Sequence, residues 1–282
     1  MSLQLGRVFR IMVLVMFLVS CKKEYSVKTN PPPPPPAEQV KKVLLKDITV
    51  PRLPSPYYHF EYNSDSTVSK VDFASGFSMY NVIYDGNKIS EMRNNIIVNH
   101  DTLRYLYDPT GKLFMIKFIN DENINYRHVA FTYEAAQVKE IEWDHRLDDG
   151  SFLIDRTLTF SYHPDGNLKT ITEHRPAISG SPESTTTRQF EQYDDKINVD
   201  DFGVIHDTYH DHLFLLQGFR LQKNNPGKES FSAAPGQTAY TIDYTYTYNN
   251  DSTPSSKMGD LLFTDGADKG KRFQSSEFYS YY

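Results

Sequence analysis

Apolar and polar residues alternate along most of the chain beyond residue 57, and turn residues break the alternation at regular intervals. The stretch "FSYHPDGNLKTI", residues 160–171, is typical: Phe160 and Tyr162 lie two apart, Pro164-Asp165-Gly166 follows, and apolar residues then return. A period of two places the aromatic rings on one face of a strand. Proline presets one backbone angle and glycine accepts a positive φ, so this stretch predicts a tight β-hairpin.

Similar hairpins recur along the chain, most with an aromatic residue two positions before a tyrosine. The anchoring tyrosines are Tyr62, Tyr84, Tyr107, Tyr133, Tyr162 and Tyr248. A single hairpin is barely stable in water, so successive hairpins must pair edge to edge to bury their aromatic face. The fold prediction is therefore all-β: one antiparallel meander of about 12 to 16 strands, which its twist curls into a barrel-like or half-open sheet.

Five of the units share a second feature after the turn, two apolar residues spaced three apart. These pairs are Val68/Val71, Ile89/Met92, Leu113/Ile116, Val138/Ile141 and Leu168/Ile171. A period of two would send the two residues to opposite faces. Either a β-bulge lies between them, or the first belongs to the turn. A third reading is a buried strand with two apolar faces.

The hairpin pattern is interrupted between Phe190 and Phe231. From Asp201 to Leu221, glycine and proline become rare, and apolar residues recur at helical spacing, at Phe202, Ile205, Tyr209 and Leu213. We expect one short helical insertion near residues 201–221, lying across one mouth or edge of the sheet. The Asn-Asn-Pro-Gly sequence at 224–227 would end it and turn the chain back.

The first 21 residues predict a targeting segment. Arg7 and Arg10 are followed by an apolar run from Ile11 to Val19, which is too short to span a bilayer, and then by Leu18-Val19-Ser20-Cys21. This order is similar to a bacterial lipoprotein signal, in which Cys21 becomes the lipid-bearing first residue. The alternative is an ordinary signal peptide with a chance cysteine. Cys21 is the only cysteine, so the mature chain has no thiol for a disulfide or a cysteine nucleophile.

The predicted organisation has three parts: a signal peptide at 1–20, a lipidated Cys21 with a proline-rich tether at 21–50, and a single β-meander domain at 51–282. Six prolines at 31–36 would form a semi-rigid spacer of roughly 20 Å. No aspartate follows Cys21, so we expect the outer membrane, with the periplasmic face or the cell surface left open. A transmembrane barrel is the rival fold, since the chain ends in aromatic residues, but the lipobox and the polar strand faces argue against it.

Charge limits the classes of partner. Removing residues 1–20 deletes two arginines and no acidic residue, so the formal charge falls from −6 to −8. An acidic chain without a basic stripe argues against nucleic acid.

One histidine-rich stretch, "HDTYHDH" at 206–212, could bind a metal. His206 and His210 would share a helix face, and His212 and Asp207 could complete a zinc site. On a strand, His206, His210 and His212 would share a face instead. A histidine-bearing surface helix is the commoner explanation of such a stretch.

Carboxylates offer a second candidate chemistry. Glu140, Glu142 and Asp144 alternate around Trp143 and form a possible ligand surface of acids beside an aromatic ring. A solvated strand face is the simpler interpretation. The adjacent aspartates at 148–149, 194–195 and 200–201 lie mostly in predicted turns, where solvation explains them, and adjacency does not provide the carboxyl separation of a glycosidase.

Three segments carry a resemblance to a known family: "YDDKIN" (193–198), "QKNNPGK" (222–228) and "YTYNNDSTPSSK" (246–257). Together with the hairpins, over roughly residues 57–282, they resemble an uncharacterised family of Gram-negative envelope lipoproteins with a porin-like β fold. The hairpins also resemble the YD-repeat style of shell-forming proteins. The resemblance implies a barrel-like sheet on a lipid tether and no established activity. Asp251-Ser252-Thr253-Pro254 replaces the family's usual glycine in the final turn, so that hairpin's type stays open.

Together these features predict an outer-membrane lipoprotein that serves as a non-catalytic binding or scaffold module. Its partners would be the membrane, through the lipid anchor, and an envelope glycan or protein, because tyrosine rings can stack on sugars while polar neighbours bind their hydroxyls. The alternative is an enzyme, either a glycan hydrolase using carboxylates near Trp143 or a metal-dependent envelope enzyme with zinc at 206–212.

Overall fold

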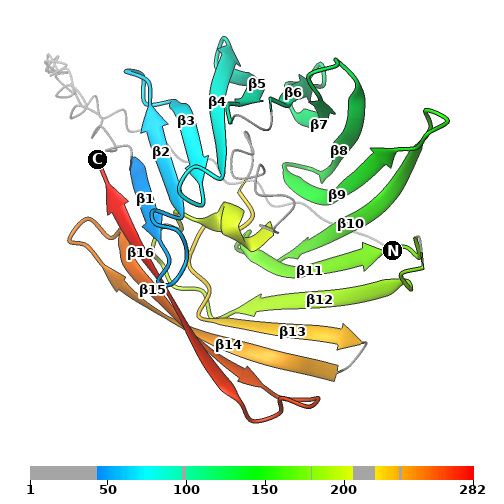
Figure 1. Cartoon of the computed structure of the whole chain (residues 1–282). Helices are drawn as coiled ribbons and strands as arrows, with labels where there is room; N and C mark the ends of the chain where they lie inside the picture. Colours follow the sequence, from blue (N-terminus) through cyan, green and yellow to red (C-terminus); the bar gives the residue numbers. More distant parts are fainter. Residues whose placement is uncertain (1–42, 97–99, 179, 206–219, 235–236) are drawn as a thin grey trace, which may run out of the picture. The chain divides into compact units, whose positions relative to one another are not determined.

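The computed structural model describes residues 43–96, 100–178, 180–205, 220–234 and 237–282. In chain order the strands are β1 (Leu45–Thr49), β2 (Tyr58–Tyr62), β3 (Val68–Phe73), β4 (Ser78–Asp85), β5 (Lys88–Asn94), β6 (Thr102–Tyr107), β7 (Leu113–Ile119), β8 (Asn125–Glu134), β9 (Gln137–Arg146), β10 (Phe152–Tyr162), β11 (Leu168–Arg175), β12 (Ser184–Glu191), β13 (Lys228–Ala234), β14 (Gln237–Tyr248), β15 (Pro254–Phe263) and β16 (Arg272–Tyr281). Each strand pairs with the next, and β16 pairs with β1, so the sixteen strands close into a barrel (Figure 1). The predicted all-β meander is confirmed. Of the two expected forms, a barrel-like sheet and a half-open sheet, the structure has the closed barrel.

Closure of the barrel depends on its two ends. Ile48 of β1 pairs with Tyr279 of β16 on one side and with Tyr58 of β2 on the other, always antiparallel. β1 begins at Leu45, so the barrel includes residues that the sequence analysis placed in the tether at 21–50. The first strand is therefore part of the barrel wall.

The three-residue apolar spacing is explained by β-bulges. On β7, Met115 pairs with Leu106 while Leu113 pairs with Tyr107, which leaves Phe114 as the extra residue. The same shift occurs near the start of β3, β5, β9, β11 and β15. The bulge is thus the correct one of the alternatives, and it brings both apolar residues of each pair to the same face.

The turn between β14 and β15 keeps the geometry of several other turns despite its missing glycine. The amide of Asn249 donates to the carbonyl of Thr253, and the amide of Ser252 donates back to Asn249, the pattern also seen at residues 163–167. Ser252 adopts a φ of 65° where Gly166 has 85°. A short polar residue therefore takes the left-handed position, and the hairpin type is unchanged.

The anchoring tyrosines form a ring of hydrogen bonds at one end of the barrel, which we call the tyrosine rim. Tyr84 donates to the carbonyl of Val68, Tyr107 to Ile89, Tyr133 to Leu113 and Tyr162 to Val138, at 2.7 to 3.0 Å. Each acceptor is the first or second residue of the preceding return strand, beside the bulge that interrupts the ladder. Each hydroxyl thus ties one hairpin to the one before it.

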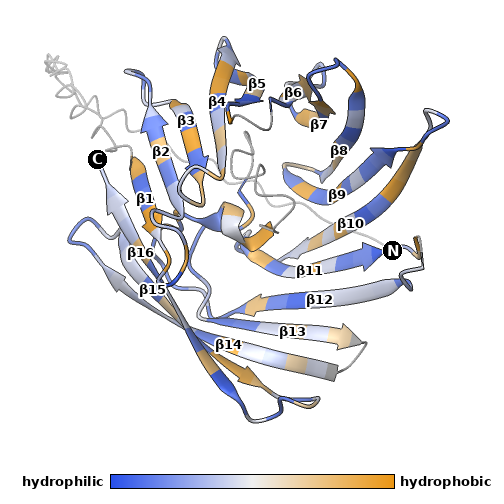
Figure 2. Ribbon diagram, viewed as in Figure 1, coloured by the Kyte–Doolittle hydropathy of each residue, from blue (hydrophilic) through white to orange (hydrophobic). Residues whose placement is uncertain are grey.

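The inner face of the barrel is apolar on most of its circumference. Val129, Ile141, Trp143 and Leu158 are inaccessible to solvent and belong to one core that runs from β1 to β12 and includes Tyr279 of β16. Figure 2 shows hydrophobic and hydrophilic residues alternating along these strands, whereas β12 and β14 are paler because they contain many Thr and Tyr residues. The interior therefore has an apolar part and a more polar part.

The outer face is polar and carries ion pairs between neighbouring strands. Glu91 of β5 binds Arg104 of β6 at 3.2 Å, and Asp144 of β9 binds His128 of β8 at 3.1 Å. A transmembrane barrel places an apolar band outside and polar residues inside. From β1 to β11 the described strands have the reverse arrangement, with an apolar inner face, and this arrangement argues against the rival fold.

The interruption of the repeat enters the barrel. We call its described parts, residues 192–205 and 220–227, the plug. A short 3-10 helix, η1 (Asp201–Ile205), lies within the ring of strands in Figure 1, and its Phe202 packs against Tyr58 and Phe60 of β2. The rest of the predicted helical insertion, residues 206–219, lies outside the described residues. Since wall side chains alone do not fill a barrel of sixteen strands, the plug completes the core.

Among the described residues, no helix is long and apolar enough to cross a membrane.

Candidate functional site

The inner wall formed by β12 to β16 differs from the rest of the interior. Its inward side chains include Arg188, Glu229, Tyr244, Lys257 and Glu277, and they face the plug. Most other inward positions hold aliphatic or aromatic residues. Charged and tyrosine side chains thus collect on one wall.

The plug is fastened at the tyrosine rim by buried amides. Asn225 donates from its side chain to both oxygens of Asp194, at 3.3 and 3.2 Å, and to the Tyr248 hydroxyl at 3.2 Å. Asn167, in the β10–β11 turn, accepts from the backbone amides of Lys223 and Asn224. The Asn-Asn-Pro-Gly segment therefore serves as a fixed joint between plug and wall.

Gly227 is required at this joint by close approach. A Cβ atom there would lie 2.8 Å from the backbone carbonyl oxygen of Gln192. The amide of Gly227 also donates to the carbonyls of Glu191 and Gln192. A side chain at this position would push the plug away from the end of β12.

A buried charge cluster joins the plug to β15 and β16. Asp200 of the plug lies 3.3 Å from the Lys257 ammonium, which is also 3.5 Å from Glu277. The Tyr279 hydroxyl lies 2.7 Å from Asp200 and 2.8 Å from Glu277. Burial alone would lower the pKa of Lys257, but the charges of Asp200 and Glu277 outweigh it and raise that pKa well above its ordinary value. Lys257 is therefore protonated and committed to these two carboxylates.

Two cavities flank this cluster. One, of about 170 Å³, lies between the plug and β12 to β16, and the other, of about 120 Å³, reaches toward β1 and β2. Asp200, Gly203, Lys257 and Glu277 line both. The larger cavity is mostly polar and has Arg188, Glu229 and Tyr244 on its wall side.

Glu229 is the most enclosed carboxylate of this wall that is not part of the charge cluster. Its residue is 7% exposed, and one oxygen accepts from the Tyr244 hydroxyl at 2.9 Å. Burial, and then the charge of Glu229, raise the pKa of Tyr244 well above its ordinary value, so the hydroxyl stays neutral and donates.

A row of aromatic rings continues from the cavity toward the opposite end of the barrel. We call it the aromatic ledge: Phe231, Tyr240, Phe263 and Phe273. Phe231 and Tyr240 stack at 4.8 Å between ring centroids, Tyr240 meets Phe263 at 6.0 Å, and Phe263 meets Phe273 at 5.9 Å. Phe273 is 56% exposed, and the other three rings are half-buried. The ledge is therefore an accessible apolar surface beside a polar cavity.

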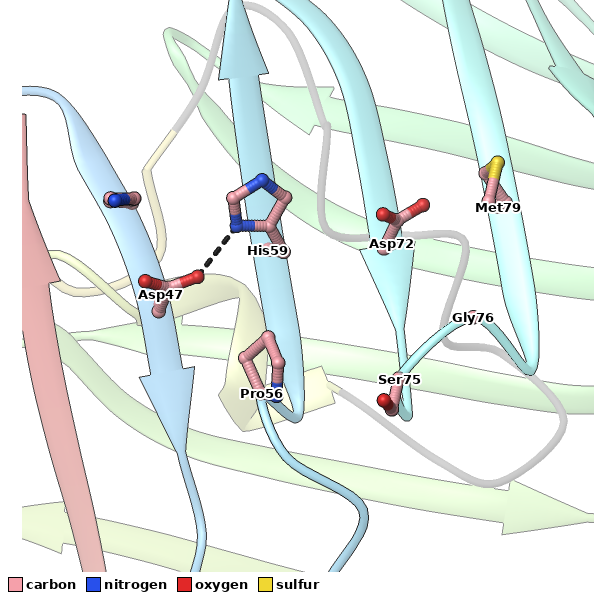
Figure 3. A pocket seen from close by; sticks show the side chains of 8 residues that line it. Asp47, Pro56, His59, Asp72, Ser75, Gly76 and Met79 are labelled. Carbon is pink, nitrogen blue, oxygen red and sulfur yellow. Dashed lines mark hydrogen bonds and ion pairs between the residues drawn. The ribbon is translucent and has the colours of Figure 1, made fainter.

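The outer face has a separate hollow of about 490 Å³ across β1 to β4 (Figure 3). There, Nδ1 of His59 lies 2.6 Å from Asp47, and Lys70 lies 3.2 Å from Asp72. His59 and Asp47 pair across adjacent strands, whereas Lys70 and Asp72 pair along β3. The hollow therefore belongs to the network of ion pairs on the outer face.

The residues singled out from the sequence fall in different places. Trp143 is fully buried on the inner face with Arg156 over its ring, at 4.6 Å, while Glu140 and Glu142 lie on the outer face of the same strand. The acids and the ring thus face opposite sides of the wall. Cys21, His206, Asp207, His210 and His212 lie outside the described residues, and no group of three His, Asp or Glu side chains elsewhere in the described chain could hold a metal.

Sequence reasoning did not identify the residues that line the inner wall. The aspartates at 194, 200 and 201 were assigned to solvated turns, but Asp200 is buried and Asp194 holds the joint. The one available signal was inward alternation on β14, where Tyr240, Tyr244, Tyr246 and Tyr248 share a face. Glu229 and Lys257 carry no local signal, because only strand order brings them together.

Comparison with known structures identifies the fold. The barrel is similar to the crystal structure of a porin-like protein from Bacteroides vulgatus, with a TM-score of 0.59 and 16% identity over 85% of this chain and 99% of that one. A porin-like protein from Bacteroides uniformis matches with a TM-score of 0.57 and 14% identity, over 80% of this chain and 89% of that one. No protein-family model matches the chain, and no curated protein sequence matches it. The likeness establishes a porin-like barrel fold.

Proposed function

We propose that the protein is a lipid-anchored module of the cell envelope that binds a glycan on the inner wall of its barrel without chemical turnover. The observation that carries the proposal is the aromatic ledge, which leads into a polar cavity on the same wall. A sugar ring presents apolar C–H faces and a rim of hydroxyls, so it needs an aromatic surface and hydrogen-bonding groups together. β12 to β16 supply both.

The dimensions of the wall suit a chain of sugars. From Lys257 at the cavity to Phe263 on the ledge is six residues along β15, or roughly 20 Å at about 3.4 Å per residue. A single ring would occupy only part of that length. The cavity would receive one end of the chain, and the ledge would support the rest.

The entry point of the chain supports a tethered arrangement. The carbonyl of Leu45 accepts from Tyr62, so the chain joins the barrel at the tyrosine rim. Phe263 and Phe273 lie near the opposite end. The chain thus enters the barrel at the end opposite the ledge, as an anchor at Cys21 followed by a proline spacer would allow.

The binding proposal is tested with matched phenylalanines on β16. Phe273 belongs to the ledge and is 56% exposed, whereas Phe278 faces outward and is 48% exposed. On a glycan array followed by calorimetry, Phe273→Ala should weaken binding at least about tenfold, and Phe278→Ala should leave it unchanged. Equal effects, no binding of any glycan, or hydrolysis of a bound glycan would contradict the proposal. A partner protein on the outer face would give the opposite ranking of the two variants.

The anchor is tested separately by cell fractionation. Cys21→Ala should release the protein from membranes, because it removes the site of lipidation and the described strands carry ion pairs on their outer face. Retention of the variant in the membrane fraction would contradict the lipid anchor and leave the binding proposal intact.

A further inference from the structure

We infer that the cavity of the inner wall selects a glycan with a free amino group, which it binds as an ammonium through Glu229. The inference rests on the proposed function and names the substrate class of the same site.

The argument begins with the burial of Glu229. The residue is 7% exposed, and Tyr244 supplies a neutral hydrogen bond at 2.9 Å. In the described part of the chain, no lysine, arginine or histidine approaches it to ion-pair distance. A buried carboxylate is unfavourable unless a cation or several donors compensate it. Among the described residues, Glu229 therefore has a hydrogen bond from Tyr244 but no cationic partner.

The two nearby cations are already engaged. Lys257 is held between Asp200 and Glu277, at 3.3 and 3.5 Å. Arg188 donates to the carbonyl of Val204 in the plug, and its guanidinium lies over the Phe190 ring at 5.9 Å. The residues that line the cavity include three carboxylates and two cations. Neither cation is therefore available to Glu229.

Glu229 lies close to the aromatic ledge. Glu229 lies two residues before Phe231 on β13, and register places Phe231 opposite Tyr240. A sugar ring stacked on these two rings would bring its substituents to the cavity. At roughly 30 Å³ per water, a cavity of about 170 Å³ has space for a small end group only.

An organic ammonium fits this site better than a metal ion. No cluster of three His, Asp or Glu side chains in the described chain could coordinate a metal. Two of the cavity carboxylates already bind Lys257, which leaves Glu229 as a single ligand. An ammonium needs only one carboxylate and neighbouring acceptors.

The experiment compares two ligands that differ only at the amino group: a β-1,4-linked glucosamine tetramer and its fully N-acetylated form, each titrated into the full-length protein by calorimetry. The free amine should bind at least about tenfold more tightly, and added salt should reduce the difference. Glu229→Gln should abolish the preference while retaining binding of the acetylated tetramer, which also shows that the variant is folded. Glu61→Gln, on the outer face, is the control and should behave as the unmodified protein.

The outcomes separate the inference from the proposed function. Equal affinity for the two tetramers, or a preference that survives Glu229→Gln, overturns the inference and leaves glycan binding standing. If neither tetramer binds, the inference is overturned, and the glycan array then decides the proposed function.

Discussion

At the scale of single residues, the repeated tyrosine serves two purposes. Its ring lies on the inner face beside the core, and its hydroxyl binds a carbonyl at the bulge of the neighbouring strand. The spacing of Tyr62 to Tyr162 and the apolar pairs predicted the strands, and a bulge was one of the stated alternatives. The role of the hydroxyl could not be predicted, because its acceptor lies 16 to 24 residues away in another hairpin.

Removal of one hydroxyl measures this role. Tyr133→Phe should lower the free energy of unfolding by about 1 kcal/mol, because the Leu113 carbonyl loses its bond at 2.7 Å. Thr132→Val, at the exposed neighbouring position, is the control and should change it by less than about 0.5 kcal/mol. Urea unfolding gives both values, and equal stability of Tyr133→Phe and the parent would rule out a contribution from the rim bonds.

Two glycines of the plug provide a matched pair. At Gly227, a Cβ atom would lie 2.8 Å from a backbone oxygen, and at Gly203 it would meet nothing within 4 Å. Gly227→Ala should therefore destabilise the fold by roughly 2 kcal/mol or more, while Gly203→Ala should have little effect. The melting temperatures of the two variants test this expectation. A Gly227→Ala variant that melts at the same temperature as the parent would show that the joint between plug and wall can move.

At the scale of elements, the plug is the part that the sequence predicted only in outline. The break in the hairpin pattern located it. Helical spacing predicted a helix near residues 201–221, and the described residues of that range contain the short 3-10 helix Asp201–Ile205. Asp200 and Asp201 could not be placed from sequence, since adjacent acids before an apolar stretch usually mark a solvated turn. These aspartates are buried because the barrel closes around the plug, and no local sequence pattern indicates that closure.

Asp201 should make plug stability depend on pH. Burial raises its pKa from 3.8 to about 6, and its side chain accepts from the Leu221 amide at 2.9 Å. The folded state thus binds the carboxyl proton of Asp201 more tightly than the unfolded state does. The resulting contribution to the free energy of unfolding is fully present below pH 3.8 and is lost as pH rises through about 6. A difference of about two pKa units corresponds to on the order of 3 kcal/mol.

Asp201→Asn removes this titration and keeps an oxygen acceptor. Its stability relative to the parent should therefore increase between pH 4 and pH 7.5, as measured by urea midpoints at both values. Asp195→Asn, at a side chain that is 86% exposed, is the control and should show no such trend. If the difference in stability between Asp201→Asn and the parent stayed constant across this pH range, the raised pKa of Asp201 would be contradicted.

At the scale of the whole molecule, the meander was predictable and its closure was not. The twist of a β-sheet predicts that a sheet of many strands curls. Closure of the barrel also requires β1 to pair with β16, which lies more than 220 residues later in the chain. A sequence boundary at residue 51 followed the proline-rich composition and missed the short strand at 45–49. Similarly, Trp143 and its neighbouring acids alternate as predicted, but the sequence alone did not show which face was inside.

Two chains that begin on either side of β1 test whether this strand is needed to close the barrel. A chain that begins at residue 51 lacks β1 and leaves the edges of β2 and β16 unpaired, so it should aggregate or melt at a clearly lower temperature. A chain that begins at residue 43 should remain monodisperse without detergent. Size-exclusion chromatography with light scattering distinguishes the two, and equal behaviour would mean that β1 is dispensable.

The tyrosine bonds that tie four of the hairpins to the one before have an evolutionary consequence. Every repeat carries its own bulge and its own tyrosine, so a tandem duplication in the gene would insert two strands that already specify how they attach to their neighbours. The remaining repeats would keep their alignment, and only the girth of the barrel would grow. Descendants of one ancestral hairpin could in this way acquire different diameters, and a chain that became too wide would need an insertion such as residues 192–227 to fill it.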